Sequence, residues 1–585
     1  MPSSSPGPRR RELLGALGAS ALGSTAGCTN LLSQFAWDSP NDLSLTIATV
    51  PASVDTAAIQ MARQLEQNLQ RAGINATYEP QSEASVLRSA LMDNDFDLFI
   101  ARHPGVDDPD KLRTMLHTRY SEEAGWQNPF GFTAPSVDEL LVTQRSQTGQ
   151  QRHETVTEIQ DRLYERQPFS VLAYPDQLTV ASTELDLERT PNGLIEAPDY
   201  LKLGTANPSF DRLRVGILGA TLTRNRNPIA VDYHSRTKVL DLIYEPLVEQ
   251  VGDDYIPWVA ANVEWDATSG PTTARVTLRE NLAWHDGERL DADDVAFTYR
   301  FLQDTAMGNE SAPVPAPLYR SRSSLVNSVS VQSDRVIELE FGDTSRPVAR
   351  RALTVPLFPR HVWTQRTEVV RTYMTQALVW ENKPAIGSGP YRFENASAGN
   401  RLVLSKNEDH FLFDGRSLGD RYAPFTAGGS FEELRFDVIE QSLLLIGSVE
   451  DDTIDIGASP IWPEHAEGAK QAPNAELLSG GNGEFYMLGF NTRRHPLNNH
   501  QFRTAVARLI DREYAVEEMM YGHAEPADSP LVQTEYLPEQ FAWDGQPTFG
   551  AFPGDAGEVD PESAKELFRD AGFRYDDSGK LVTQN

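Results

Sequence analysis

The single cysteine of this chain, Cys28, is the feature that most limits how its 585 residues can fold. One cysteine forms neither an intrachain disulfide nor a cysteine-built metal site. Packed apolar cores must therefore hold the fold together, and a hydrophobic fraction of 39% with nine Trp, eighteen Tyr and twenty-five Phe is ample for them. At roughly 150 residues per domain, the length predicts three or four domain-sized units. This composition excludes disordered and fibrous classes.

The charge balance excludes a further class. There are 52 basic and 84 acidic residues, a net charge of −32, and only eight of the basic residues are Lys. Such a surface repels phosphate backbones and anionic lipid, so we expect no nucleic-acid partner. Acid-rich, Lys-poor composition spread along the whole chain is typical of proteins from salt-adapted cells, where about 1 M salt screens the repulsion. An acidic protein of ordinary habitat is the alternative.

The first 28 residues are predicted to be an export signal. An RR-x-L-L pattern at residues 10–14 precedes an uncharged run at 13–27, which is shorter than the roughly 20 residues that span a bilayer. The pattern resembles a twin-arginine signal, and residues 25–28 resemble the lipidation motif of lipoproteins, with Cys28 as the modified residue. A chance cysteine is the alternative. Residues 29–42 then form a tether. We expect a protein that lies outside the cytoplasm, anchored to the cytoplasmic membrane by lipid on Cys28.

Hydrophobic periodicity predicts a mixture of strands and helices. One helix follows a cap at Asp55 and ends at Gly73, and another opens at Asp560-Pro561 and closes at Gly572. Further helices are expected at 137–146, 152–166 and 499–511, and strands at 44–49, 76–79, 97–101, 213–218, 274–279, 336–341, 402–405 and 485–491. This pattern indicates large α/β or α+β lobes.

Five segments in the middle and at the end of the chain carry a family resemblance. They are Leu240–Glu249, Tyr255–Val295, the Gly-Ser-Gly-Pro-Tyr element within 386–391, the Phe-Asn-Thr and Phe-Arg-Thr-Ala elements within 490–505, and Pro561–Phe573. In this order they resemble the extracytoplasmic solute-binding proteins of family 5, which serve peptide and nickel ABC transporters. In that family the first segment is an early helix.

The resemblance implies a fold and a function. The fold is α/β (mixed α+β), periplasmic-binding-protein-like of type II, with two lobes and the extra subdomain of family 5. The implied function is that of a receptor that closes its lobes on a peptide or similar small polar solute. The resemblance implies no enzymatic activity. A membrane ABC permease would be its partner. The resemblance implies no cofactor and no metal, and we expect a monomer.

The order of the segments indicates a circular permutation. Elements that the family places after its "A-G-F" motif lie at the front of this chain instead, among them Ser136–Leu141 and Phe169–Val180. Residues 43–168 are predicted to form the second half of the smaller lobe, and residues 169–212 to return to the large lobe and form a linker. Residues 213–474 are predicted to form the large lobe with the inserted subdomain, and residues 475–585 the first half of the smaller lobe. Crossings between lobes are expected near 166–175 and 470–484, and Asn585 is expected close to Asn41. An unrelated front domain on a truncated receptor is the alternative.

The loop before Asp108-Pro109 is the first candidate binding site. Peptide-binding relatives have a tryptophan there and, three residues on, an aspartate that accepts the ammonium group of the peptide. The resemblance places Arg102 at the tryptophan position and Gly105 at the aspartate position, with Asp107 as a substitute acid. We expect Arg102 and His103 to face the cleft and to favour a ligand with carboxylate or other acceptor groups. The alternative is that Arg102 pairs with a surface carboxylate.

Four other residues are candidates for the cleft. Asp232 and Tyr233 follow Pro228 in a loop of the large lobe, and Tyr486 and Asn491 belong to the strand predicted at 485–491. Packing or turn formation is the alternative role for each.

The segments that resemble catalytic motifs lack the spacing that the chemistry requires. Asp286-Gly287 after His285 marks a tight turn, and Gly387-Ser388-Gly389 lacks the spacing of a nucleophile elbow. The glycines of 479–483 precede no Lys-Ser/Thr and predict a loop. His495 and His500 are expected at the surface or at a cap.

A sensory module is the alternative function from another class. It would bind the same solute outside the cell and pass occupancy to a signalling partner. A neighbouring permease gene would favour transport, and a neighbouring transducer gene would favour sensing. An enzyme is the third possibility, and turnover by the purified protein would favour it.

Overall fold

The computed structural model of this chain describes residues 41–205, 210–230, 238–267, 270–371, 373–415, 418–426, 431–481 and 483–583. The predicted signal with Cys28 and nearly all of the predicted tether lie outside these residues. So do Asp232, Tyr233 and Asn585.

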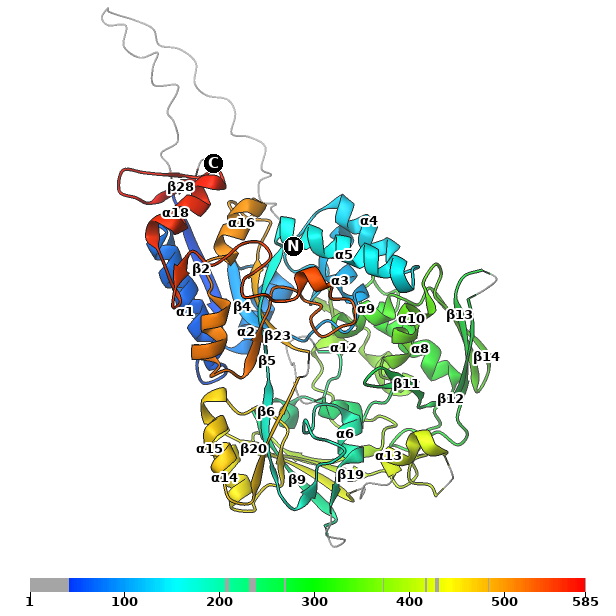
Figure 1. The fold of residues 1–585 in the computed structure, drawn as a ribbon. Coiled ribbons are helices and arrows are strands. Elements are labelled where there is room, and N and C mark those ends of the chain that lie inside the picture. The colour runs from blue at the N-terminus through cyan, green and yellow to red at the C-terminus, as the bar shows by residue number, and fades with distance from the viewer. Residues whose placement is uncertain are drawn as a thin grey trace, which may run out of the picture.

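The described chain forms two lobes (Figure 1). Each lobe has a hydrophobic core of its own. The core of the larger lobe draws on residues between Ala181 and Leu478. The core of the smaller lobe draws on Leu43 to Tyr174 and again on Phe485 to Leu581, so both ends of the chain build it. A minor third core lies under one face of the larger lobe's main sheet. Both predicted lobes therefore have apolar interiors of their own.

A six-stranded sheet with the order β24-β5-β23-β4-β2-β3 forms the centre of the smaller lobe. Every residue of β23 is buried, as expected of a strand covered on both faces. β2 runs parallel to β3 and β4, and β23 runs antiparallel to β4 and β5. The strands are β2 (Ser44–Thr49), β3 (Asn75–Pro80), β4 (Leu98–His103), β5 (Phe169–Pro175), β23 (Phe485–Phe490) and β24 (Ala524–Pro526).

Helices cover this sheet, and two of them begin at the predicted caps. Asp55 accepts a hydrogen bond from the Ala58 backbone N–H at 3.1 Å, and Asp560 accepts one from Ser563 N–H at 2.8 Å. The helices are α1 (Thr56–Arg71), α2 (Glu83–Arg88), η1 (Ser89–Asp93), α3 (Asp110–Leu116), η2 (Thr118–Tyr120), α4 (Pro135–Thr143), α5 (Gly149–Arg166), α16 (His500–Ala507), α17 (Arg512–Tyr514), η9 (Ala515–Met519), η10 (Glu539–Phe541) and α18 (Pro561–Asp570).

The larger lobe contains two main sheets. One has seven strands in the order β18-β19-β20-β9-β21-β6-β22, and the other has four in the order β12-β13-β15-β14. The seven are β6 (Gln177–Ser182), β9 (Arg212–Leu218), β18 (Tyr391–Ser397), β19 (Arg401–Lys406), β20 (Glu433–Ile439), β21 (Ile456–Gly457) and β22 (Ala475–Gly480). The four are β12 (Ala260–Asp266), β13 (Thr273–Leu278), β14 (Ser328–Ser333) and β15 (Val336–Glu340).

The remaining elements of the larger lobe are mostly short. Its longest helix, α8 (Ala292–Gln303), begins at Asp291, whose side chain accepts from the Asp293 and Asp294 N–H groups. The other helices are α6 (Ala197–Lys202), α7 (Thr221–Arg224), η3 (Val239–Leu242), η4 (Pro317–Tyr319), α9 (Arg320–Ser323), α10 (Arg346–Ala349), η5 (Arg350–Thr354), α11 (Arg360–Trp363), η6 (Thr364–Arg366), α12 (Gln376–Val379), η7 (Asp420–Tyr422), α13 (Ala423–Thr426), α14 (Ser442–Glu450), η8 (Pro463–His465) and α15 (Ala466–Gln471). Three small two-stranded antiparallel sheets pair β7 (Leu185–Asp186) with β8 (Gly204–Thr205), β10 (Val248–Val251) with β11 (Asp254–Pro257), and β16 (Val369–Arg371) with β17 (Met374–Thr375).

The two ends of the described chain meet in the smaller lobe. β1 (Asn41–Asp42) pairs antiparallel with β28 (Leu581–Thr583), which also pairs with β27 (Arg574–Tyr575). The pair β25 (Gly554–Asp555) and β26 (Glu558–Val559) lies in the same part of the chain. In Figure 1 the first and last described segments, blue and red, share one lobe.

The lobe boundaries differ from the predicted ones. The chain crosses between β5 and β6, at 175–177, and between β22 and β23, at 480–485. β5 belongs to the sheet of the smaller lobe, although 169–212 was expected to return to the larger one. β22 belongs to the larger lobe, although 475 was expected to open the smaller one. An apolar run shows that a strand is buried but not which sheet it joins.

Two helix expectations also need correction. The helix expected at 499–511 ends at Ala507, and α17 follows separately at Arg512. The segment Leu240–Glu249 was likened to a helix, but it forms η3 and the start of β10, separated by Pro246, which interrupts helical hydrogen bonding. Across the described ranges, no helix is both long enough and apolar enough to cross a membrane.

Candidate functional site

The direction of the strands brings the end of β4 to the boundary between the lobes. β4 and β5 both run antiparallel to β23, so they run in the same direction. β5 continues into the larger lobe through β6. Arg102 and His103 are the last residues of β4, so they lie at the strand ends that are directed toward the larger lobe. Tyr486, near the start of β23, lies at the same end of the sheet.

Arg102 is paired inside the smaller lobe. Its Nε donates to Asp55 Oδ2 at 2.8 Å and its Nη2 donates to the Tyr486 hydroxyl at 2.6 Å, while that hydroxyl donates to Asp55 Oδ1 at 2.8 Å. Burial would lower the pKa of Arg102, but the negative charge of Asp55 holds it above its usual value. A cavity of about 20 Å³ beside Arg102 has room for little more than one water. The partner is thus a buried carboxylate, 3% exposed, and not a surface one.

His103 and Asn491 do not face the space between the lobes, so these two expectations are wrong for this arrangement. Successive residues of a strand point to opposite faces. The His103 ring is 1% exposed and lies against Phe485 and Trp126, with centroids 4.7 and 4.6 Å away. Asn491 follows the opposite end of β23, where its side-chain amide donates to the carbonyls of Asn94 and Phe96 at 3.0 and 2.9 Å.

Gly105 has a steric reason to be glycine. Its φ is +82°, and a Cβ placed on it would lie 2.4 Å from the carbonyl oxygen of Gly483. The loop after β4 therefore touches the second crossing between the lobes, backbone against backbone. Lys111 Nζ donates to the Gly105 carbonyl at 2.5 Å. The aspartate that the resemblance implies at this position has no room here.

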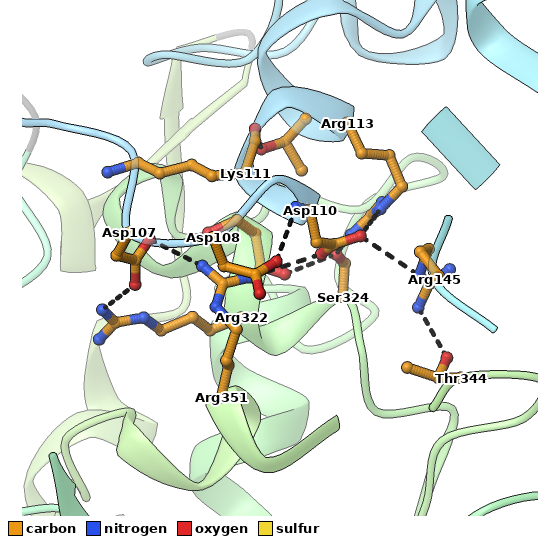
Figure 2. Close-up of polar contacts among 12 residues, drawn as sticks. Asp107, Asp108, Asp110, Lys111, Arg113, Arg145, Arg322, Ser324, Thr344 and Arg351 are labelled. Carbon is orange, nitrogen blue, oxygen red and sulfur yellow. Dashed lines mark hydrogen bonds and ion pairs between the residues drawn. The ribbon is translucent and has the colours of Figure 1, made fainter. Parts of the chain in front are cut away.

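Asp107, the expected substitute acid, joins the two lobes (Figure 2). Its carboxylate accepts from Arg351 Nη2 at 2.9 Å and from Arg322 Nη2 at 3.2 Å, and both arginines belong to the larger lobe. Burial would raise the pKa of Asp107, but these guanidinium groups hold it far below its usual value. Asp107 is therefore committed to protein contacts.

Asp108 and Asp110 are paired within the smaller lobe. Arg152 donates to both oxygens of Asp108, at 2.6 and 3.0 Å. Arg113 donates to Asp110 Oδ1 at 2.9 Å. Asp110 is fully buried, and burial would raise its pKa, but Arg113 and further arginines lower it. The loop is a crosslinked structural element.

Further contacts extend this boundary along α9 and its neighbours. Arg320 binds Glu123 through two hydrogen bonds of 2.6 and 2.7 Å. Arg113 Nη2 donates to Ser324 Oγ at 2.9 Å, and Arg145 Nη2 donates to Thr344 Oγ1 at 3.2 Å. We name the contacts Asp107–Arg351, Asp107–Arg322 and Glu123–Arg320 the interlobe ion pairs. Every one of them joins the smaller lobe to the larger.

A second set of carboxylates in the described part of the chain lacks the arginine partners that bind Asp107, Asp108 and Asp110. Asp241 in η3 and Glu249 in β10 are only partly exposed, and across the described residues neither side chain forms a hydrogen bond or an ion pair. Burial raises the pKa of Asp241 to about 6, with Lys238 opposing, and burial together with Asp241 raises the pKa of Glu249 well above its usual value. Lys238 is itself bound to Glu196, at 2.6 Å. Asp241 and Glu249 are thus available to a cationic group.

The same region includes basic groups from both lobes. Burial lowers the pKa of Lys111 to about 8, with Asp107 opposing and Arg322 and Arg351 lowering it further. Arg322 also acts on the carboxyl of Asp241. Lys111 of the smaller lobe therefore interacts electrostatically with Arg322 and Lys238 of the larger lobe, and both of these act on Asp241. Sequence reasoning missed Asp241 and Glu249, because nothing in the local sequence shows that a carboxylate is buried and lacks an ion-pair partner.

The segments around His285 and Gly387, which contain catalytic residue types, make contacts within the fold. His285 Nε2 lies 3.0 Å from the Gly389 carbonyl oxygen, and burial lowers the pKa of His285 to about 4. Its neighbour Asp286 is bound to His361 instead, at 2.7 Å. A Cβ on Gly387 would lie 1.9 Å from the Ile243 carbonyl oxygen, so this glycine permits close backbone packing. Among the described residues, no group of three or more His, Cys, Asp or Glu side chains could hold a metal ion.

Comparison with known proteins gives a family match. The family described as bacterial extracellular solute-binding proteins, family 5 Middle, matches residues 254–585. A Brucella suis protein named as a binding protein is 23% identical over 442 residues, which cover 68% of this chain and 67% of that protein. A Brucella ovis protein named as an ABC transporter peptide-binding protein is 21% identical over 395 residues, covering 67% and 65%.

A solved structure is similar over the same extent. The oligopeptide-binding protein AppA of Bacillus subtilis, in complex with a nonapeptide, is 19% identical with a TM-score of 0.45, and the match covers 64% of this chain and 66% of AppA. The chain spans from about half to two thirds of the length of the curated relatives, since a Brucella melitensis binding protein is covered over 55%.

Proposed function

This chain belongs to the bacterial extracellular solute-binding proteins of family 5, and from that premise we propose that it captures a peptide or similar small polar solute between its lobes for a membrane ABC permease. One observation carries the proposal: two lobes with separate cores are joined by two crossings and meet across a boundary lined with charged side chains. Two connections allow hinge closure on a ligand.

The charges at the boundary suit a small polar ligand with a cationic group. Asp241 and Glu249 form no side-chain hydrogen bond or ion pair among the described residues, and Lys238, which acts on both, also acts on Lys111 of the smaller lobe. An ammonium group placed between the two carboxylates would offset the unfavourable effect of burying them. Asp232 and Tyr233, which precede Lys238, stay predictions for the same site.

Native mass spectrometry of the protein purified from its own host tests the function. We expect a co-purified solute that dissociates on unfolding. Binding is then measured by thermal shift with trialanine, trilysine and triglutamate, using Asp241→Asn and the exposed Asp334→Asn as the matched pair. A solute or peptide that raises the melting temperature of the control but not that of Asp241→Asn supports the site. Failure of every probe, with no co-purified solute, contradicts the proposed function.

We also propose that the segments are circularly permuted relative to the family order. The support is that residues 43–175 and 485–583 share one sheet and one core, while β1 and β28 are paired, so their ends are adjacent. Few buried contacts change when adjacent ends are joined and an exposed loop is cut. A reordered chain, 210–583 followed by a short linker and 41–205, should unfold within a few degrees of the original. A reordered chain that fails to fold would contradict the proposal.

The N-terminal sequence supports a proposal on where the protein is located in the cell. We propose export by the twin-arginine pathway and anchoring through lipid on Cys28, because residues 10–28 have the matching pattern. A Cys28→Ser chain should appear in the medium, while the unaltered chain stays with the membrane fraction. The acidic, Lys-poor composition supports a salt-adapted host.

A further inference from the structure

The interlobe ion pairs connect the lobes outside the two crossings themselves, although the loop that carries Asp107 also touches the second crossing at Gly105. The crossings occupy 175–177 and 480–485, whereas the ion pairs use α9 and η5 on one side and the loop and short elements around α3 on the other. In Figure 1, α3 and α9 lie to the right of β5 and β6, where one crossing runs. A hinge motion at the crossings that parts the lobes would therefore have to separate these ion pairs.

These contacts have the geometry of strong interactions. Arg320 meets Glu123 with two parallel hydrogen bonds, and both side chains are mostly shielded, at 14% and 22% exposed. Arg351 is 2% exposed, so its guanidinium is held out of water beside Asp107. Charge-assisted, two-point contacts of this kind are about twice as strong as neutral hydrogen bonds.

Breaking the contact between Asp107 and Arg351 is unfavourable because the guanidinium group of Arg351 is buried. Arg351 Nη1 also lies 3.8 Å from Asp108 and 3.7 Å from Asp110, so three carboxylates of the smaller lobe surround one guanidinium of the larger lobe (Figure 2). If the lobes separate, Arg351 loses all three counter-charges at once. A buried ion that loses its partners is strongly destabilised unless water replaces them.

We infer that the interlobe ion pairs are a latch that holds the lobes closed by direct protein contacts, independently of any solute. Asp107 and Glu123 are its two residues on the smaller lobe, and Arg322, Arg351 and Arg320 are their partners. Solute entry then requires the latch to open, so the competent open form is a minor population. This goes beyond solute capture, which requires only that closure follows binding.

Distance between the lobes tests the latch. Dyes are attached to cysteines at the exposed positions Gln151 of α5 and Gln332 of β14, in the full chain with Cys28→Ser. Single-molecule energy transfer is recorded after dialysis, with native mass spectrometry verifying that no solute remains. We expect most molecules in the high-transfer population, and we expect Asp107→Asn with Glu123→Gln to lower the closed-to-open ratio at least about tenfold.

A matched variant controls for charge. Glu280→Gln with Asp334→Asn also removes two negative charges, but from exposed ion pairs inside the larger lobe, and should leave the ratio unchanged. Glu123→Arg should open the lobes, and adding Arg320→Glu should restore closure. Circular dichroism verifies folding, and Glu123→Gln alone serves if the double variant is unfolded. A mainly low-transfer starting chain, or a folded latch variant that stays closed, would overturn the inference. Neither outcome depends on which solute the protein binds.

Discussion

Asp110 and Asp241 both lie near the boundary between the lobes, yet their carboxylates are held in opposite electrostatic states. Asp110 is fully buried and bound to Arg113 at 2.9 Å, and the surrounding arginines lower its pKa although burial would raise it. Asp241 is partly exposed and unbonded among the described residues, and burial raises its pKa to about 6. Burial alone therefore does not decide whether the pKa of a carboxyl group is raised or lowered. A bound counter-charge decides it.

The difference indicates which acids hold the structure and which are open to a ligand. Acids of the 107–110 loop stabilise the protein through fixed arginines, so they have little capacity to bind anything else. Asp241 and Glu249 are instead strained by burial and by each other. Groups that reduce stability in this way are frequent at functional sites.

Asp110→Asn should lower the free energy of unfolding by about 3–5 kcal/mol at pH 7, because it leaves buried Arg113 without its counter-charge. The pKa of Asp110 is lowered in the folded state, so its stabilisation is present above the ordinary carboxyl pKa and is lost as the pH falls. The difference between the two proteins should therefore shrink below about pH 4. Urea unfolding measures it, with exposed Asp334→Asn as control. A loss of unfolding free energy under about 1 kcal/mol would show that Asp110 is not a stabilising acid, and would contradict the difference drawn between Asp110 and Asp241.

Asp241→Asn should act in the opposite direction. The pKa of Asp241 is raised in the folded state to about 6, so the charged form is disfavoured. The variant should gain up to about 3 kcal/mol at pH 7.5, and the gain should disappear as the pH falls through 6 to about 4. Thermal unfolding across this pH range checks it, and loss of solute binding should accompany the gain. A less stable variant at pH 7.5 would show that Asp241 is a structural acid.

Gly105→Ala should lower the free energy of unfolding by about 2–3 kcal/mol, since it combines a positive φ with a clash against Gly483. Gly219→Ala separates the two effects, because φ at Gly219 is +85° and nothing lies within 4 Å of its added Cβ. We expect about 1 kcal/mol there. Equal losses in urea unfolding would mean that the loop before Asp107 can move away from the crossing.

Asp286→Asn should have the smallest effect, below about 1 kcal/mol, because its partner His361 is 40% exposed and water solvates both groups. The same urea measurement that is used for Asp110→Asn checks it. A loss as large as that of Asp110→Asn would show that pairing matters irrespective of burial.

Much of the local structure was predictable from the sequence. β2 matches the predicted strand at 44–49, and α1 and α18 begin at the predicted caps Asp55 and Asp560. These signals depend on neighbours within a few residues, so they are present in any window of the chain. The family was likewise recognisable from short motifs, and the match to residues 254–585 confirms it.

The candidate site was predictable only in part. The loop around Arg102 and Asp107 does reach the boundary between the lobes, but Arg102 is bonded to Asp55 and Asp107 to Arg351, partners 47 and 244 residues away. His103 was expected beside Arg102, yet the alternation of the strand turns it into the core. No local pattern indicates such pairings.

The sequence by itself determined the apolar segments, the caps, the acidic surface and the family, because each depends on residue type and short spacing. The tertiary structure alone decided which sheet β5 and β22 join, why residue 105 is glycine, and which carboxylates are bonded. The reason is physical. A charge has the same chemistry everywhere in the chain, but its effect depends on burial and on partners that folding brings from distant positions.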